Sequence, residues 1–421
     1  MAGETLPPLR FTGSRDLAQR LVIATLTGRT IRISQIRNTA SSSSVGLAPH
    51  EVSLLRLLDA ISNGAHIELS PTGTTLLYKP GLLVGCSSAG KPVRHIIPAT
   101  NTRGIAYFLV PLCLLAPFAK APLDILFSGP GVITSPTDSD PSVDTIRTAL
   151  LPLLACFAPD TLPRPPPVEL KIIRRAHPSA FAPSRSGDDN AVGGGEVRLV
   201  HAAQLRLPRT IHWLAPGRVR RIRGVAATVG LSPATNARLI AAARELLQPL
   251  SPDTYIFSDV SAAPSSSSRS GGRPIGVGFS LSLVAETHAH TLYSADAASN
   301  TSTPTSATTT PESAGRLCAL RLLDAVAAGG CVPASAAPAV LTLMALGGAA
   351  GGADVGRVAL GCDVVAAPNV VRLARDLRTF GAAGWGLRPR DEGDGKGEED
   401  EMMVVVSVVG KGVGNVGRKL A

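Results

Sequence analysis

The chain has 421 residues, 44% of them hydrophobic, so it can bury a large core, and its length indicates about two to three domains. Aromatic residues make up only 4%, which excludes a core built mainly on aromatic packing. The net charge is +10 and arginine carries most of it, which favours a polyanionic partner such as RNA, because arginine makes planar, two-pronged contacts to phosphate. The alternative is compositional bias, since the whole chain is rich in alanine, glycine, proline and arginine.

The cysteines and the start of the chain argue against a secreted or membrane-spanning protein. No Cys-x-x-Cys pair occurs, which predicts small buried side chains in a reducing compartment. Residues 1–10 lack the apolar core of a secretory signal. The most apolar run, Ile105 to Phe118, contains two prolines and is shorter than the roughly 20 residues that a membrane span needs. We therefore expect a soluble intracellular protein without a membrane partner. The cysteines are Cys86, Cys113, Cys156, Cys318, Cys331 and Cys362.

The first part of the chain predicts a strand, a helix and a hairpin, in that order. Arg29 to Arg37 alternates apolar and polar residues, which is typical of a strand. Pro49 suits the first turn of a helix and Gly64 suits its end. Ala65–Leu69 and Thr74–Tyr78 predict a hairpin. A similar order of elements recurs at residues 124–133, 143–157 and 168–173.

One segment occurs twice: Leu55–Ala60 returns as Leu320–Ala325. Recurrence of a helical segment indicates one supersecondary unit used more than once, and it places the candidate site where repeated units meet. Further helices are predicted at residues 316–328, 340–346 and 369–380. We therefore predict an α+β fold with a large domain of repeated βαβ-type units and a smaller inserted α+β domain.

Polar, low-complexity stretches divide the chain at residues 178–195, 261–274, 300–311 and 391–401. Residues 219–283 interrupt the repeat-like units with a basic strand, a helix from Pro233 to Leu247 and apolar strands. We expect a large domain formed by residues 1–200 and 312–390, a small domain inserted at 201–295, and an acidic, flexible extension at 391–421. Val404 to Val409 in that extension resembles a strand, and whether it folds is left open.

Four arginines lie between Pro216 and Gly224. On a strand, two of them would point to each face, so neither face could be buried unless the charges were paired. The segment therefore predicts an edge that binds RNA or a protein partner, and a charged edge strand that blocks aggregation explains it equally well. The arginines are Arg218, Arg220, Arg221 and Arg223.

The segment Pro98 to Gly104 precedes an apolar helical run. Its small polar residues offer backbone N–H groups and hydroxyls to an anion, and Arg103 adds positive charge. An ordinary helix cap at Thr100 or Asn101 is the simpler explanation.

Two further motifs are weaker. Gly193 to Gly195 fits a phosphate loop and a flexible linker equally well. His288 and His290 would share one face of a strand, but no third ligand follows at a suitable spacing, so we expect no metal site.

The last predicted helix carries Arg372, Arg375, Asp376 and Arg378 beside an apolar face. We expect these side chains to point outward into solvent, with Arg372 and Asp376 paired at i, i+4. The alternative is a metal-free ribonuclease in which Arg375 and Arg378 stabilise the phosphorane and Asp376 acts as the base. The neighbouring arginines are expected to lower the pKa of Asp376, which would make it a poor base at neutral pH.

Four segments carry a more specific signal when they are taken in order, namely Phe11–Gln19, Pro98–Gly104, Gly193–Val197 and Gly381–Leu387. Together they resemble the RNA 3′-terminal phosphate cyclases, and more closely the eukaryotic cyclase-like branch of that family. The resemblance extends from about residue 10 to about residue 388. It implies a pseudo-threefold large domain of repeated α+β units with a small inserted domain, in agreement with the repeated hexapeptide and the interruption described above.

The chain departs from the true cyclases at two places. Those enzymes carry Glu-Gly-Gly-Gly-Gln near the start, where this chain keeps only Gln19, and Leu17 and Ala18 add side chains where glycines let the backbone approach a nucleotide. True cyclases also use a histidine that takes AMP from ATP, and the matching position here is Asp363. The resemblance therefore implies no cyclase activity, no catalytic residue and no cofactor. The former active site is expected to remain as a pocket for an anion or a peptide, formed by Arg15, Gln19, Asn101, Thr102 and Arg103.

The resemblance implies a role in ribosome assembly instead. The cyclase-like branch belongs to the nucleolar small-subunit processome, acts in early pre-rRNA processing and binds a large assembly GTPase. We expect a non-catalytic scaffold in the nucleolus that binds this GTPase, pre-rRNA and other processome components. The alternatives are an endoribonuclease that cuts pre-rRNA through Arg375, Asp376 and Arg378, and a cyclase that recruits another nucleophile.

Overall fold

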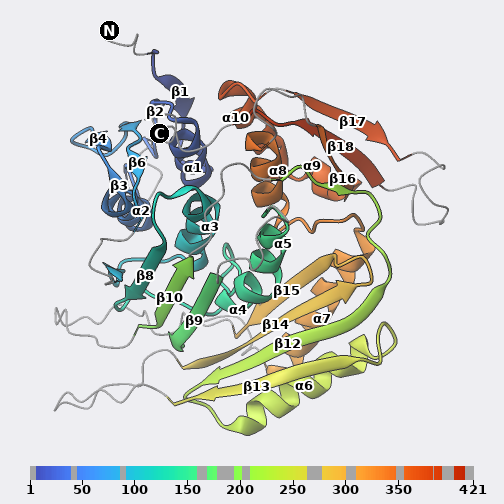
Figure 1. The fold of residues 1–421 in the computed structure, drawn as a ribbon. Helices are drawn as coiled ribbons and strands as arrows, with labels where there is room; N and C mark the ends of the chain where they lie inside the picture. The colour runs from blue at the N-terminus through green and yellow to red at the C-terminus, as the bar shows by residue number, and fades with distance from the viewer. Residues whose placement is uncertain are drawn as a thin grey trace, which may run out of the picture.

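A group of helices lies at the centre of the molecule, with sheets around it and a further sheet with two helices on one side (Figure 1). The structure is a computed structural model. It describes residues 6–38, 45–85, 92–158, 168–177, 194–201, 209–262, 277–299, 310–347, 355–382, 384–390 and 403–412. Most of the four stretches that the sequence indicates as linkers, together with Cys86 and Gly193, lies outside these residues.

The first unit is a four-stranded sheet in the order β1-β2-β5-β4. Strands β1 and β2 are parallel and the other pairs are antiparallel. A parallel pair requires a crossover, and α1 supplies it. The predicted strand, helix and hairpin are all present, although the helix ends at Ile61, ahead of Gly64. The elements are β1 (Leu9–Thr12), α1 (Leu17–Thr27), β2 (Ile31–Ser34), α2 (Pro49–Ile61), β4 (His66–Leu69) and β5 (Leu76–Lys79), with a short pair of β3 (Ser62–Asn63) and β6 (Leu82–Leu83).

The second unit repeats this topology with the strand order β7-β8-β10-β9. Again the first pair is parallel and the other pairs are antiparallel. The elements are β7 (Val93–Ile96), α3 (Ala106–Leu115), η1 (Ala116–Phe118), β8 (Leu123–Ser128), α4 (Val143–Thr145), η2 (Ile146–Leu150), α5 (Leu151–Ala155), β9 (Val168–Arg174) and β10 (Glu196–His201).

The third unit has the same topology, in the order β11-β16-β18-β17. Three units of one topology confirm the predicted fold class. The elements are β11 (His212–Trp213), α8 (Ala337–Leu346), β16 (Val355–Gly361), α9 (Cys362–Ala366), α10 (Pro368–Thr379), β17 (Trp385–Pro389) and β18 (Met403–Val409).

The crossover helices α1, α3 and α8 form the centre of the large domain, where α3 contacts both of the others (Figure 1). Most of their side chains are apolar and buried, and α3 and α8 are apolar on nearly all sides, so they are stable only inside a core. One cluster of buried side chains runs through all three units. Among the described residues, every helix is too short or too polar to cross a bilayer.

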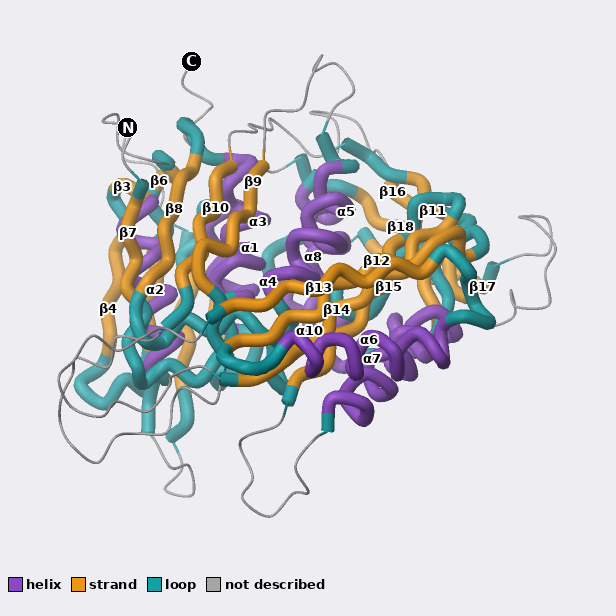
Figure 2. The backbone as a smooth tube through the Cα atoms, turned by 90° about the horizontal axis from the view of Figure 1, so that it is seen from below, coloured by secondary structure: helices purple, strands orange, loops and turns teal. Residues whose placement is uncertain are grey.

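The inserted domain interrupts the third unit between β11 and α8. Its sheet has a different order, β13-β12-β14-β15, and a separate hydrophobic cluster joins it to α6 and α7. Figure 2 shows these two helices together along one side of the sheet. The elements are β12 (Val219–Val229), α6 (Pro233–Leu247), β13 (Thr254–Ser261), β14 (Gly278–Thr287), β15 (Leu292–Ala298) and α7 (Pro311–Ala327).

Three expectations about domain organisation need correction. Helix α7 was expected in the large domain, but Cys318, Ala319 and Leu322 pack in the core of the inserted domain. The repeated hexapeptide therefore lies on α2 of the first unit and on α7 of the inserted domain, and it does not mark the repeated units. Residues 391–421 were expected to form a flexible extension, with the folding of the part after residue 402 left open, but residues 403–409 form β18, which pairs with β16 on one side and β17 on the other.

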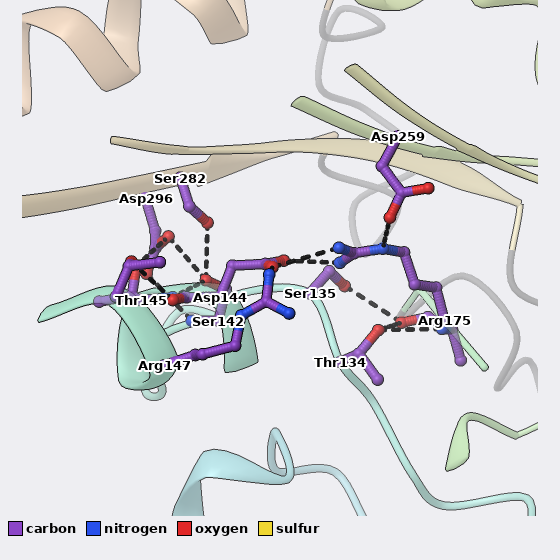
Figure 3. Close-up of polar contacts among 12 residues, drawn as sticks. Thr134, Ser135, Ser142, Asp144, Thr145, Arg147, Arg175, Asp259, Ser282 and Asp296 are labelled. Carbon is purple, nitrogen blue, oxygen red and sulfur yellow. Dashed lines mark hydrogen bonds and ion pairs between the residues drawn. The ribbon is translucent and has the colours of Figure 1, made fainter. Parts of the chain in front are cut away.

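A polar network fastens the inserted sheet to the second unit (Figure 3). Arg175, directly after β9, donates to Asp144 of α4 (2.6 and 3.1 Å) and to Asp259 of β13 (2.7 Å). Asp296 of β15 accepts hydrogen bonds from the Ser142 backbone N–H (2.9 Å) and from the Thr145 hydroxyl (2.7 Å). The Ser142 hydroxyl oxygen caps the helix that begins with α4, since it accepts from the Thr145 backbone N–H (3.0 Å), and Asp296 holds this cap residue from β15. The second unit therefore contacts the sheet of the inserted domain at β14 and β15, through α4.

Candidate functional site

A cavity of about 530 Å³ opens where α1, α3 and α8 meet. The first residues of each of these helices line it, so all three repeated units contribute. Helix N-termini carry partial positive charge and unpaired N–H groups, so their convergence favours an anion. This is the meeting point of repeated units at which the sequence analysis expected the candidate site.

Three carboxylates line the cavity, and arginines of the chain pair with all of them. Glu51 pairs with Arg37 and Asp16 pairs with Arg372. Glu51 also accepts a hydrogen bond from the Ala48 backbone N–H (2.7 Å), which caps the start of α2. The third carboxylate, Asp140, pairs with Arg103. Because the carboxylates are engaged within the protein, the lining is not an acidic site that would repel a bound anion.

The anion expected beside Arg103 is a carboxylate of the protein itself. Arg103 donates to both oxygens of Asp140 through Nε and Nη2, each at 2.7 Å. The Gly104 backbone N–H donates to the same carboxylate at 3.0 Å. The guanidinium also lies 4.7 Å from the centre of the Tyr107 ring. Arg103 lines the cavity, but its two-pronged contact is already made by Asp140.

Among the other expected pocket residues, Arg15 and Gln19 line the cavity, whereas Asn101 and Thr102 do not. Asn101 is buried and donates from Nδ2 to the carbonyls of Arg103 and Gly131, each at 2.7 Å, so it braces the loop. Arg15 is exposed, and no ion pair joins it to another described residue. The Nε2 atom of Gln19 is buried without a hydrogen-bond partner among the described atoms.

His50 is a cavity residue that the sequence analysis missed. It is the second residue of α2, and its ring packs edge-on against Tyr107 with centroids 4.9 Å apart. Burial, followed by the nearby Arg103, lowers the pKa of His50 to about 4, so its imidazole is neutral at pH 7. Within the described part of the chain, no hydrogen bond orients this ring. Nothing in the local sequence marks His50, because its place beside Tyr107 arises from packing between units.

Asp363, expected at the position of the missing nucleophile, lies outside the cavity. It is exposed in the first turn of α9 and is not among the lining residues. Its carboxylate is therefore not placed to repel a phosphate in the cavity.

The Arg375–Arg378 cluster is not assembled on one face of α10, and the outward direction predicted for Asp376 is wrong. Arg375 and Arg378 are exposed, whereas Asp376 is 6% exposed. The carboxylate of Asp376 pairs with Arg20 of α1, at 2.8 Å from Nε, and Arg372 pairs with Asp16. Burial raises the pKa of Asp376, contrary to the predicted decrease, although Arg20 opposes this effect.

The arginine-rich strand is an inner strand for most of its length. From Ile222 onward, β12 lies between β13 and β14, and a bulge between Val219 and Arg221 breaks the simple alternation that the sequence analysis assumed. Arg221 pairs with Glu286 and Arg223 with Asp253. Arg218 and Arg220 are exposed ahead of the doubly paired part of the strand.

The two weaker motifs have structural explanations. His288 and His290 lie in the turn between β14 and β15, and not on a strand face as predicted. Among the described residues, no group of three or more His, Cys, Asp and Glu side chains could hold a metal ion. A Cβ atom on Gly194 would come within 1.7 Å of the Gly129 carbonyl oxygen, so this position requires glycine for close packing of two backbones.

Comparison with known proteins agrees with this architecture. The sequence pattern of the family described as RNA 3′-terminal phosphate cyclase matches residues 9–362. The chain belongs to this family. This confirms the resemblance that the four sequence segments indicated. The matched part ends ahead of Asp363 and of α10.

Relatives of this cyclase-family chain cover nearly its whole length. The RNA 3′-terminal phosphate cyclase-like proteins of Mus musculus and Homo sapiens are each 38% identical to it, over 98% of both sequences. A protein of Schizosaccharomyces pombe called an rRNA processing protein is 34% identical, again over 98% of both sequences.

Proposed function

We propose that this protein is a non-catalytic factor in rRNA processing, which acts in assembly of the small ribosomal subunit. The names of relatives that match 98% of the chain support rRNA processing. The state of the cavity supports a non-catalytic role and is the observation that carries the proposal. The three carboxylates of its described lining are paired with arginines, and among the described residues no hydrogen bond orients the His50 ring in the way that a partner usually orients a catalytic imidazole.

The proposed partners are pre-rRNA, a large nucleolar assembly GTPase and other components of the small-subunit processome, and the proposed location is the nucleolus. The net charge of +10 supports contact with RNA. The cavity, whose lining includes the exposed Arg15, is proposed to hold an anionic group or a peptide of such a partner.

An adenylation assay tests the non-catalytic part. Purified protein is incubated with ATP labelled in the α-phosphate, beside an active RNA 3′-phosphate cyclase as a positive control and a His50→Ala variant. We expect no covalent AMP on this chain. Labelling that His50→Ala abolishes would show a cyclase with a recruited nucleophile and would refute the proposal.

Capture of tagged protein from nuclear extract tests the assembly part. We expect pre-rRNA and a nucleolar GTPase among the captured molecules. Recovery of metabolic enzymes without pre-ribosomal components would contradict the proposed role.

The endoribonuclease alternative has less support, because Arg20 occupies the carboxylate of Asp376, and Arg375 and Arg378 are exposed on another side of the helix. Cleavage of a pre-rRNA fragment by purified protein, lost in Arg378→Ala while folding is retained, would restore it.

A further inference from the structure

Two aromatic side chains are exposed on the inserted domain. Tyr255 and Phe257 of β13 are 58% and 55% exposed. Among the described residues, no other phenylalanine, tyrosine or tryptophan belongs to the exposed class. An exposed aromatic ring does not contribute the free energy that its burial would supply. In this chain only 4% of the residues are aromatic, and two of them are exposed side by side on one strand.

The two rings share one face of the sheet. They are two residues apart on a strand, which spaces them about 7 Å apart along it. The register places Arg223 of β12 beside Tyr255, and Val225 beside Phe257. We call Tyr255, Phe257, Arg223 and Val225 the aromatic platform.

The surroundings leave this platform uncovered. Helices α6 and α7 cover the other face of the sheet, where Ile256 and Ile222 are buried. On the platform's own face, the large domain contacts β14 and β15 through α4, and the network around Arg175 reaches β13 only at Asp259 (Figure 3). The start of β13 lies beyond these contacts, at the outer edge of the sheet (Figure 1).

Four arginines lie at or just ahead of the start of β12, which adjoins the start of β13. Arg221 and Arg223 are balanced by Glu286 and Asp253. The burial pattern exposes Arg218 and Arg220 at the adjoining end of β12, and no ion pair links either of them to another described residue. Two guanidinium groups therefore remain available to phosphates at the end of β12 that adjoins the start of β13.

We infer that the aromatic platform binds single-stranded RNA by stacking unpaired bases on Tyr255 and Phe257, with Arg218 and Arg220 contacting the backbone. Sequence-tolerant RNA modules use this combination of aromatic rings on a sheet face and neighbouring arginines. The inference builds on the proposed role in rRNA processing and names the surface that contacts the RNA. A protein ligand would match the rings but would leave the unpaired arginines without an anionic counterpart.

The test measures binding of the full-length protein to a short fluorescent oligouridine by anisotropy. We expect Tyr255→Ala and Phe257→Ala each to weaken binding by about tenfold, since loss of one stacked base costs about that much. Tyr255→Phe keeps the ring and should bind like the wild type. Leu387→Ala, at a side chain 63% exposed on β17, is the matched control and should change nothing.

Two further experiments distinguish base stacking on the rings from nonspecific attraction between RNA and positive charge. A double-stranded RNA of equal length should bind more weakly, because its bases are already paired and stacked. Oligouridine carrying 5-bromouridine should crosslink under ultraviolet light to the peptide that contains Tyr255 and Phe257.

Equal affinity of the alanine variants and the wild type, or crosslinks confined to other peptides, would overturn the inference. Loss of a captured protein, but not of RNA, from Tyr255→Ala would overturn it too and would indicate a protein-binding edge. These outcomes leave the proposed function intact, since that fails only if the wild type captures no pre-ribosomal component at all.

Discussion

Arg20 of α1 and Asp376 of α10 lie 356 positions apart and form a two-pronged ion pair, 2.8 Å from Nε to Oδ2 and 3.3 Å from Nη2 to Oδ1. Their side chains are only 11% and 9% exposed. The guanidinium also lies 4.8 Å from the centre of the Phe11 ring, which stacks on Phe380. The pair therefore joins the first repeated unit to the third.

Replacing Asp376 should destabilise the protein. Asp376→Ala leaves the buried guanidinium of Arg20 without its partner, which typically costs about 3–5 kcal/mol of unfolding free energy. Urea unfolding measures the change. Arg378→Ala, on an exposed side chain of the same helix, should stay within about 0.5 kcal/mol of the wild type. Equal unfolding free energies of Asp376→Ala and the wild type would show that the pair does not stabilise the fold. Because the variant is expected to be less stable, any activity assay on it has to be done under conditions in which it remains folded.

Removing Arg175 should loosen the inserted domain. Arg175→Ala leaves the 4% exposed side chain of Asp144 with only Arg147 as a cation, and we expect a loss of about 3 kcal/mol. Hydrogen exchange should increase first in β13, because Arg175 joins Asp259 of this strand to Asp144 of α4. Arg238→Ala breaks an exposed pair with Glu312 and should have no measurable effect. Unchanged exchange in β13 of the Arg175 variant would refute this role of Arg175.

Acid should destabilise the protein partly through His177, which is 1% exposed. Burial lowers its pKa from 6.5 to about 4. Between these values the unfolded state binds more protons than the folded state, so stability falls as the pH drops from about 6.5 to about 4. His177→Gln should flatten the stability profile in that window by up to about 1.4 kcal/mol per pH unit. Leu387→Ala, at an exposed side chain of β17 that does not titrate, should leave the profile unchanged, and identical slopes for all three proteins would contradict the prediction.

The cysteines should differ in reactivity. They were expected to be buried, yet Cys156 and Cys362 are exposed. Burial raises the pKa of Cys113 and of Cys331 to about 12, so few of their thiols ionise at pH 8. Iodoacetamide labelling mapped by mass spectrometry should modify Cys362 first and the two buried thiols only after denaturation. Rapid native labelling of Cys113 would show that the core of the large domain opens easily.

Local elements were predictable where a single pattern decides them. Helix α6 has the predicted limits, because Ser232 caps it ahead of Pro233 and its apolar residues recur at helical spacing. The predicted hairpin appears as β4 and β5 for a similar reason. The amphipathic pattern of α10 wrongly predicted that Asp376 points into solvent. Such a pattern shows which residues are polar, but it does not show which of them a neighbouring helix covers.

By itself, the sequence determined several strands and helices, among them α2, α6 and the hairpin of β4 and β5, together with the net positive charge and the family, because periodicity, turn residues and spaced segments act within short stretches of chain. Only the tertiary structure decided which charges are satisfied and which are free. It joined Arg20 to Asp376 and Arg103 to Asp140, brought His50 to Tyr107, and left Tyr255 and Phe257 uncovered. The physical reason is that burial and ion pairing depend on contacts between segments far apart in the chain, and local patterns do not specify those contacts.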